Sequence, residues 1–262
     1  MLELLALPAA AGAARAPLVF VHGAYVGAWC WAEHFLPWFA ERGHPVYALS
    51  LRGHGESAGR ERLHEFGLAD FADDLAAAVR GLDGPPVLIG HSMGALVVQK
   101  FLEREPGAAR AAALLCPVPP FGVLPATFSL ALTRPALFAE INALALGGRA
   151  SRAALQEALF AAPVEAERLE RYFRRMQPES RRALLDMSGW GLPQTWRTAL
   201  PDTLVIGAER DVLISAALAR STAQLLGADY LLLPGLGHAV MLETGWRAAA
   251  EGLAGWLVER GA

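Results

Sequence analysis

A glycine-flanked serine that directly follows an apolar run limits the folds open to this chain. Residues 86–89 (Pro-Val-Leu-Ile) have the length and composition of a buried strand, Gly-His-Ser-Met-Gly follows at residues 90–94, and residues 95–103 can form a helix. A Gly-x-Ser-x-Gly pattern between a strand and a helix is typical of the nucleophile elbow, where side chains beside the serine would collide with backbone. We predict that this turn holds the hydroxyl of Ser92 at the tip of a strand.

The rest of the chain alternates short apolar runs with segments of helical periodicity. Strands are predicted at residues 1–8, 17–21, 46–49, 86–89, 111–116, 203–206 and 230–233, and helices at residues 29–42, 64–80, 95–103, 216–226 and 245–259. Fully apolar strands separated by helices are typical of a parallel sheet that is covered on both faces. We therefore predict an α/β fold with a mostly parallel central sheet and helices on both faces.

This alternation stops between residues 117 and 200, where prolines, a Gly-Gly pair and helical stretches replace the strands. We interpret this part as a helical insertion over the sheet, and residues 1–116 and 201–262 as the core. A chain of 262 residues with 54% hydrophobic content can bury one large core.

Charge and hydropathy exclude several classes of function. A net charge of −3 gives no electrostatic case for binding nucleic acid or an acidic membrane surface, and no uninterrupted apolar run is long enough to span a bilayer. The N-terminal run carries Glu3 where a signal peptide carries basic residues, so we expect a first strand and a cytoplasmic location. Cys30 and Cys116 are expected to be buried free thiols. No feature of the sequence specifies an oligomeric state.

A serine hydroxyl needs a base to take its proton, and an acid to orient that base. The candidate acid is Asp211, which follows the strand at residues 203–206 by a short loop. Glu209 is an alternative candidate for this acid. Asp202 lies at the other end of that strand, away from the serine. An alternative interpretation is that Asp211 caps the helix that follows.

The candidate base is His238, in a glycine-rich loop after the last predicted strand. It completes the chain order serine, acid, histidine that accompanies the elbow in this kind of sheet. The other six histidines are interpreted differently: three as solvated residues in or beside helices, and three as loop residues that bond to backbone. The first group is His34, His44 and His64, and the second is His22, His54 and His91.

An oxyanion also needs N–H donors. The amide of Met93 directly follows the serine at the start of a helix, which makes it one candidate donor. The amide of Ala24, after His22-Gly23 at the tip of an earlier strand, is the second. The His-Gly pair is equally compatible with a plain turn.

These motifs resemble the α/β-hydrolase superfamily over nearly the whole chain. The matching segments are residues 22–29, 52–57, 90–94, 207–211 and 237–238. The usual acid before the Arg-Gly-His-Gly motif is replaced here by Ser50. The serine nucleophile argues against members that open epoxides or remove halides with an aspartate.

The resemblance implies an esterase-like or lipase-like serine hydrolase with residues 117–200 as a lid. The expected reactants are a small to medium apolar carboxylic ester and water, and no metal or cofactor is required. Alternatives on the same triad are a C–C bond hydrolase, a cofactor-free perhydrolase or a lyase, and a further one is a non-catalytic binding protein. Tyr25, Trp29 and Met241 flank the predicted site and are pocket candidates. Apolar lid residues that could face a substrate or pack the lid onto the body are Phe121, Phe128, Leu130, Leu132, Phe138, Trp190 and Trp196.

Overall fold

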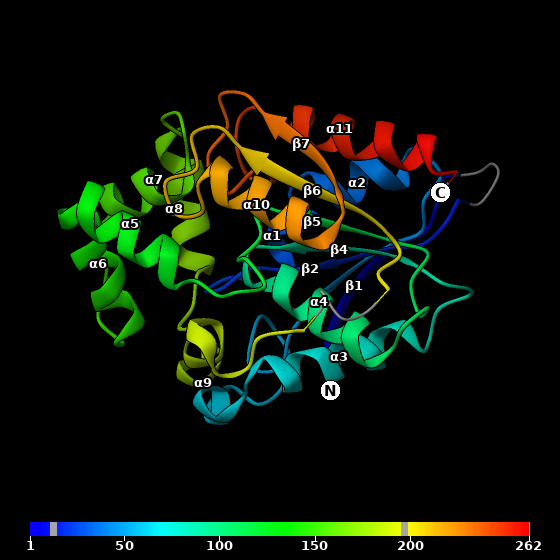
Figure 1. Ribbon diagram of the computed structural model, residues 1–262, viewed down its shortest axis with the longest axis horizontal. Helices are drawn as coiled ribbons and strands as arrows, with labels where there is room; N and C mark the ends of the chain where they lie inside the picture. Colours follow the sequence, from blue (N-terminus) through cyan, green and yellow to red (C-terminus); the bar gives the residue numbers. More distant parts are fainter. Residues whose placement is uncertain (11–14, 195–198, 262) are drawn as a thin grey trace.

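Seven strands form one sheet at the centre of the structure, a computed structural model that describes residues 1–10, 15–194 and 199–261. The strands, in chain order, are β1 (Glu3–Leu7), β2 (Leu18–Val21), β3 (Val46–Ser50), β4 (Val87–His91), β5 (Ala111–Leu115), β6 (Asp202–Ala208) and β7 (Asp229–Leu233). Their order across the sheet is β1-β3-β2-β4-β5-β6-β7, and the part from β2 through β4, β5 and β6 to β7 can be followed in Figure 1. Only β1, at the edge, pairs antiparallel with its neighbour; the other six strands described are parallel. The mostly parallel sheet predicted from the sequence is confirmed.

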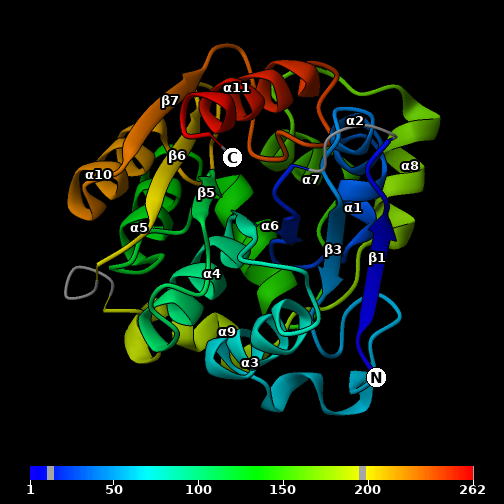
Figure 2. The same ribbon diagram turned by 90° about the vertical axis from the view of Figure 1, so that its right-hand side faces the viewer.

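Helices cover both faces of the sheet (Figure 2). One face carries α1 (Trp29–Ala32), α2 (Phe35–Ala40) and α11 (Trp246–Glu259), and the other carries α3 (Leu68–Val79), α4 (Met93–Arg104) and α10 (Ala216–Leu226). Neighbouring strand residues point to opposite faces, so Leu18 and Phe20 of β2 join the first core while Val19 and Val21 join the second. This explains why β2 and β5 are apolar at every position and why β4 begins with three consecutive apolar residues.

Two predicted helices have different bounds in the structure. The segment predicted as one helix at residues 29–42 is divided into α1 and α2, because Pro37 lacks an amide hydrogen and is tolerated only in the first turn of a helix. The helix predicted from residue 64 begins at Leu68, after a 3₁₀ turn, η1 (Arg60–Glu65). There the Asp70 carboxylate accepts the amide hydrogen of Gly67 at 2.8 Å and ends the preceding loop.

The chain between β5 and β6, which we call the insertion, contributes only helices among its described residues. They are α5 (Leu124–Thr133), α6 (Pro135–Ala145), α7 (Arg152–Leu159), α8 (Ala166–Arg175), α9 (Arg181–Leu185) and a π-helical turn, η2 (Asp186–Trp190). In Figure 1 the arrows of β6 and β7 point toward α5–α8, so the insertion lies at the carboxyl end of the sheet. In the described residues, we find no helix with both the length and the apolar character needed to cross a membrane.

Candidate active site

Ser92 occupies the turn between β4 and α4 in a strained conformation. Its φ of 51° lies in the left-handed region, which residues with a side chain rarely adopt. A Cβ atom at Gly90 would lie 2.5 Å from the carbonyl oxygen of Gly94, and one at Gly94 would lie 2.4 Å from the carbonyl oxygen of Val21. Both positions require glycine, so the turn is as tight as the sequence predicts.

Asp211 lies in the loop after β6, with its carboxylate buried. Its Oδ1 atom accepts the amide hydrogens of Leu213 and Ile214, both at 2.8 Å, and its Oδ2 atom lies 2.7 Å from Nδ1 of His238. The helix that follows, α10, is capped by Ser215 instead. The two amides fix one oxygen of the carboxylate, which leaves the other to orient the imidazole.

The rival acids do not reach the histidine. Glu209 accepts the amide hydrogen of Gly235 at 2.8 Å and is exposed. Asp202 is the first residue of β6, at the opposite end of the strand from Asp211. Among the three candidates, only Asp211 contacts His238.

Ser92 and His238 line the same cavity. Nε2 of His91, the residue before the serine, donates to the carbonyl oxygen of His238 at 2.9 Å, and the two rings lie 4.8 Å apart. Within the described residues, no hydrogen bond joins the Ser92 hydroxyl to His238. Catalytic hydrogen bonds are often long in the absence of substrate and shorten only in the reacting complex.

The two residues whose amides are candidate donors lie beside Ser92 in the cavity. Ala24 and Met93 line the cavity beside Ser92, and in the part of the chain that is described neither amide hydrogen takes part in a hydrogen bond. A Cβ atom at Gly23 would lie 3.2 Å from that of Ser92, so the loop after β2 packs directly against the serine. Among the described residues, both amides therefore lie beside Ser92 without an internal hydrogen-bond partner.

His22 orients the peptide that carries the Ala24 amide. Its Nδ1 donates to the carbonyl oxygen of Gly23 at 2.7 Å, and its Nε2 accepts the amide hydrogen of Leu51 at 3.1 Å. The neutral tautomer with hydrogen on Nδ1 satisfies both bonds. Burial, reinforced by the charge of neighbouring His54, lowers the pKa of His22 to about 3 and maintains this neutral form.

The predicted division of the other six histidines into solvated rings and rings that bond to loop backbone is only partly correct. His54 and His91, like His22, bond to loop backbone as expected. His64 is exposed, but His44 is buried and its Nδ1 contacts the carbonyl oxygen of Ala16 at 2.9 Å. His34 is half-buried and stacks on Trp246 with ring centroids 4.7 Å apart. The prediction of a solvated ring is wrong for His44, because the start of β2 folds over it.

A third side chain lies close to the acid and the base. The donor atoms of Cys116, Asp211 and His238 all lie within 4.8 Å of one another, a cluster that could in principle hold a metal ion. Burial and the Asp211 charge raise the pKa of the Cys116 thiol well above its ordinary value. A metal ion would have to displace both this thiol proton and the proton between Asp211 and His238. The residues present therefore fit a metal poorly.

Cys30 and Cys116 are both free and buried, as predicted.

Two adjoining cavities contact Ser92 and His238. The large compartment has a volume of about 270 Å³, and its walls come mainly from the insertion, which includes Val118, and from Leu213 and Ile214. The small compartment has a volume of about 120 Å³ and is bounded on the core side by Val26, Ala239 and Leu242. Each is lined mainly by apolar side chains, so the site favours apolar groups on both sides of the serine.

Two of the three predicted pocket residues line these compartments. Tyr25 contributes to both and Met241 to the small one. The expectation for Trp29 is not met: it lines neither compartment, because its ring packs 6.0 Å from that of Tyr172 and beneath the guanidinium of Arg175.

The apolar residues of the insertion separate into two groups. Leu130 and Phe138 line the large compartment. Others expected to face a substrate or the body are instead exposed to solvent, and these are Phe121, Phe128, Leu132 and Trp190. Trp196 lies outside the described residues.

Sequence reasoning missed the partner that replaces the absent acid at position 50. The hydroxyl of Ser50 donates to Oε2 of Glu3 at 2.5 Å and accepts the amide hydrogen of Ala28 at 2.9 Å. The same Glu3 oxygen accepts the amide hydrogen of Glu56 at 3.0 Å. The edge strand β1 thus supplies the carboxylate that position 50 lacks, a pairing that required knowledge of the β1–β3 register.

The structure also adds a buried ion pair that no local motif indicates. Glu179, from the insertion, lies 3.1 Å from Nε2 of His54, and both side chains are fully buried. Burial opposes the charge on each residue, but the opposite charge of the partner and the hydrogen bonds to each group together outweigh it, so the pKa of His54 is raised and that of Glu179 is lowered. His91 behaves differently, because burial and the His238 charge lower its pKa well below the ordinary value.

These shifts predict that the free energy of unfolding is highest near pH 6.5, the ordinary pKa of histidine. Below it the unfolded chain binds protons at His22 and His91 that the folded chain does not, so acidification costs ~1.4 kcal/mol per pH unit for each proton. Above it the folded chain holds a proton on His54 that the unfolded chain releases, so this contribution is lost as the pH rises through the raised pKa. Urea denaturation at a series of pH values from about 5 to 8 measures the profile. A steady rise in stability across this range would contradict the assignment.

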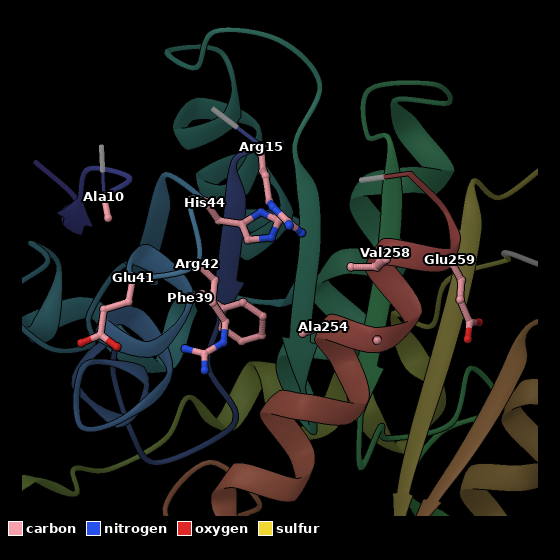
Figure 3. A pocket seen from close by; sticks show the side chains of 11 residues that line it. Ala10, Arg15, Phe39, Glu41, Arg42, His44, Ala254, Val258 and Glu259 are labelled. Atoms are coloured by element: carbon pink, nitrogen blue, oxygen red, sulfur yellow. The ribbon is translucent and has the colours of Figure 1, made fainter. Parts of the chain in front are cut away.

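A larger cavity lies away from these residues. It has a volume of about 780 Å³ and lies between α2, the start of β3 and the last turns of α11. Figure 3 shows Phe39 and His44 on one side and Ala254 and Val258 on the other. None of the residues expected to take part in catalysis lines it, so volume alone does not identify the reactive site.

Comparisons with known proteins agree with the fold and the motifs. A monoacylglycerol lipase of Mycolicibacterium smegmatis is 28% identical over 237 residues, which is 86% of this chain and 82% of that protein. Norfluorocurarine synthase 1 of Strychnos is 34% identical over 118 residues, which is 42% of this chain and 41% of that protein. The structure of an esterase from Exiguobacterium antarcticum superimposes with a TM-score of 0.72 at 16% identity, covering 98% of this chain and 95% of that one. Residues 18–251 match the model of the Alpha/beta hydrolase family. The chain belongs to the alpha/beta hydrolase family.

Proposed function

We propose that the protein hydrolyses carboxylic esters, with Ser92 as nucleophile, His238 as base and Asp211 as the acid that orients it. The observation that carries this proposal is the buried 2.7 Å contact between Asp211 and His238, beside a strained serine that lines the same apolar cavity as the histidine. The similarity to a monoacylglycerol lipase, which extends over most of both chains, supports it.

The hydrogen on Nδ1 of His238 is directed to Asp211, which leaves Nε2 unprotonated and facing the cavity. Nε2 takes the Ser92 proton as the serine oxygen attacks the ester carbonyl, and the imidazolium then gives that proton to the departing alcohol. Water enters, loses a proton to His238 and cleaves the acyl-serine bond, which releases the acid and restores the serine hydroxyl. No other proton donor is needed at any step.

The carbonyl oxygen becomes negatively charged in both halves of the reaction and needs donors at the position it then occupies. The amides of Ala24 and Met93 are proposed for this role because both line the cavity and neither has an internal partner among the described residues. The Met93 amide also lies at the N-terminus of α4, where the helix dipole favours negative charge.

The two compartments indicate the size of the ester. At ~30 Å³ for each water-sized group, the large compartment holds about nine non-hydrogen atoms and the small one about four. Residues 117–200 are proposed to act as the lid, because Ala126, Leu130 and Ile141 supply much of the large compartment's wall. The proposed substrate is an apolar ester of small to medium size. One relative, similar over part of the chain, is named a synthase and not a hydrolase. Other carbonyl chemistry is therefore the alternative to be tested.

A series of p-nitrophenyl esters tests this proposal. We expect rapid turnover of the acetate and the butyrate, because the p-nitrophenyl group, with about nine non-hydrogen atoms, matches the large compartment and an acyl chain of up to about four carbons matches the small one. The octanoate should turn over more slowly, and the palmitate should have at least about a tenfold lower kcat/KM, because its acyl chain exceeds both compartments combined. Slow turnover throughout the series would favour another carbonyl reaction, and ligand binding without turnover would favour a binding protein.

A further inference from the structure

One stretch of the insertion bonds to the loops that carry the candidate site. This stretch, residues 176–180 between α8 and α9, is here called the anchor segment. The side chain of Gln177 accepts the amide hydrogen of Gly55 and donates to the carbonyl oxygen of Gly53, both at 2.9 Å. The backbone amide of Gln177 donates to the carbonyl oxygen of Tyr25, also at 2.9 Å. The anchor segment thus joins the loop after β3 to the loop after β2.

Glu179 is the charged centre of this junction. Its Oε2 atom accepts the amide hydrogen of Tyr25 at 3.0 Å, its Oε1 atom accepts that of Ser180 at 2.6 Å, and both oxygens lie 3.1 Å from Nε2 of His54. A fully buried carboxylate is stable only when it is bonded in this way. These bonds hold the Glu179 carboxylate in one position, and they therefore fix the direction of the hydrogen bond that it accepts from the Tyr25 amide.

Tyr25 has an unfavourable backbone conformation, with φ of 67°. Such a conformation persists only where surrounding contacts fix it. Both of its backbone polar groups bond to the anchor segment, the amide to Glu179 and the carbonyl to Gln177. The bond to Glu179 fixes the peptide between Ala24 and Tyr25, and the bond to Gln177 fixes the peptide that follows Tyr25.

Ala24 is consequently held from both sides. The preceding peptide, which includes the Ala24 amide, is fixed by His22 through the carbonyl oxygen of Gly23. The following peptide is fixed by Glu179 through Tyr25. The direction of the Ala24 N–H bond depends on both peptides, and one of them is controlled from the insertion.

We propose that Glu179 is a positioning residue for the oxyanion hole, acting through Tyr25 on the direction of the Ala24 amide. The insertion then completes the catalytic geometry in addition to lining the substrate cavity. This inference rests on the proposed function, because it takes the Ala24 amide as a donor to the reacting oxygen.

The test compares Glu179→Ala with Glu179→Gln and with a matched control, Asp186→Ala. Asp186 is also a buried carboxylate of the insertion, but it accepts the amide hydrogen of Leu68 and a bond from Arg182, away from the loop after β2. Loss of either carboxylate is expected to lower the melting temperature, so stability alone does not distinguish them. Assays are run well below the melting temperature of each variant.

We expect Glu179→Ala to lower kcat for p-nitrophenyl butyrate by about tenfold or more, with KM within about twofold of the parent value. Butylboronic acid, which forms a tetrahedral adduct with a serine and places an oxygen in the oxyanion hole, should lose affinity by the same factor. Glu179→Gln retains an acceptor for the Tyr25 amide and should recover part of kcat, while Asp186→Ala should keep it.

Three results would overturn the inference. They are an unchanged kcat in Glu179→Ala, an equal loss of kcat in Asp186→Ala, or a loss of kcat without a loss of boronate affinity. Each of these leaves the proposed function intact if the parent protein turns over the ester. A parent protein without turnover would instead refute the proposed function, and this inference with it.

Discussion

Replacing Ser92 with alanine is expected to lower kcat for p-nitrophenyl butyrate by about a millionfold. In the proposed mechanism the substitution removes the atom that forms the acyl bond, so the proposed oxyanion hole of Ala24 and Met93 can assist only the direct attack of water. KM should change little, because both compartments remain as they are. Measurement requires protein expressed and purified separately from the parent, since a trace of parent enzyme would exceed the residual rate.

Ser221→Ala is the matched control, because this exposed hydroxyl on α10 bonds only to the carbonyl oxygen of Ala217 among the described residues. It should retain the parent kcat. Circular dichroism and the melting temperature establish that Ser92→Ala is folded. Ester turnover in folded Ser92→Ala within about tenfold of the parent rate would show that another group performs the attack.

Asp211→Asn is expected to lower kcat by about ten thousandfold. The amides of Leu213 and Ile214 require an acceptor, so the side-chain oxygen of asparagine will face them and its NH₂ group will face His238. The imidazole then accepts at Nδ1 and carries its hydrogen on Nε2. In this tautomer it cannot take the serine proton, although the geometry of the site is preserved.

Glu209→Gln and Asp202→Asn are the controls for this effect. Both remove a carboxylate from the ends of β6, and neither touches His238. Each is expected to keep kcat within about threefold of the parent value. A larger loss in Glu209→Gln than in Asp211→Asn would transfer the role of the acid to Glu209.

The sheet was predictable because its strands are buried on both faces. A strand such as β4 contributes Val87 and Ile89 to one core and Leu88 to the other, so these consecutive positions are all apolar and the run stands out from its neighbours. The elbow was predictable for a related reason. Gly90 and Gly94 are required by contacts within a few residues and with the adjacent strand, and these leave a mark on the local sequence.

Helices α5 and α6 were harder to predict because they lack a distinct polar face. Leu130 and Phe138 line the large compartment, while the equally apolar Phe128 and Leu132 are exposed to solvent. Pro135 suggests an interruption in the sequence, but it is the first residue of α6, where its missing amide hydrogen has no cost.

The contacts of Glu179 were beyond prediction from one sequence. Its partner His54 lies 125 residues away along the chain, and the two are joined only after the insertion has folded back over the sheet. No periodicity or spacing encodes such a contact. Ser50 and Glu3 illustrate the same limit, since their bond depends on the antiparallel register of β1.

One part of the insertion lines the cavity and another part bonds to the loops after β2 and β3. This division determines where substitutions can alter substrate preference without disturbing those loops. Helices α5 and α6 contribute wall residues such as Thr127 and Asn142, but among the described residues they form no hydrogen bond to the loops after β2 and β3. The anchor segment forms those bonds. Directed evolution toward bulkier substrates can therefore be concentrated on the inner faces of α5 and α6, while a library that varies residues 177–179 would mostly sample inactive proteins.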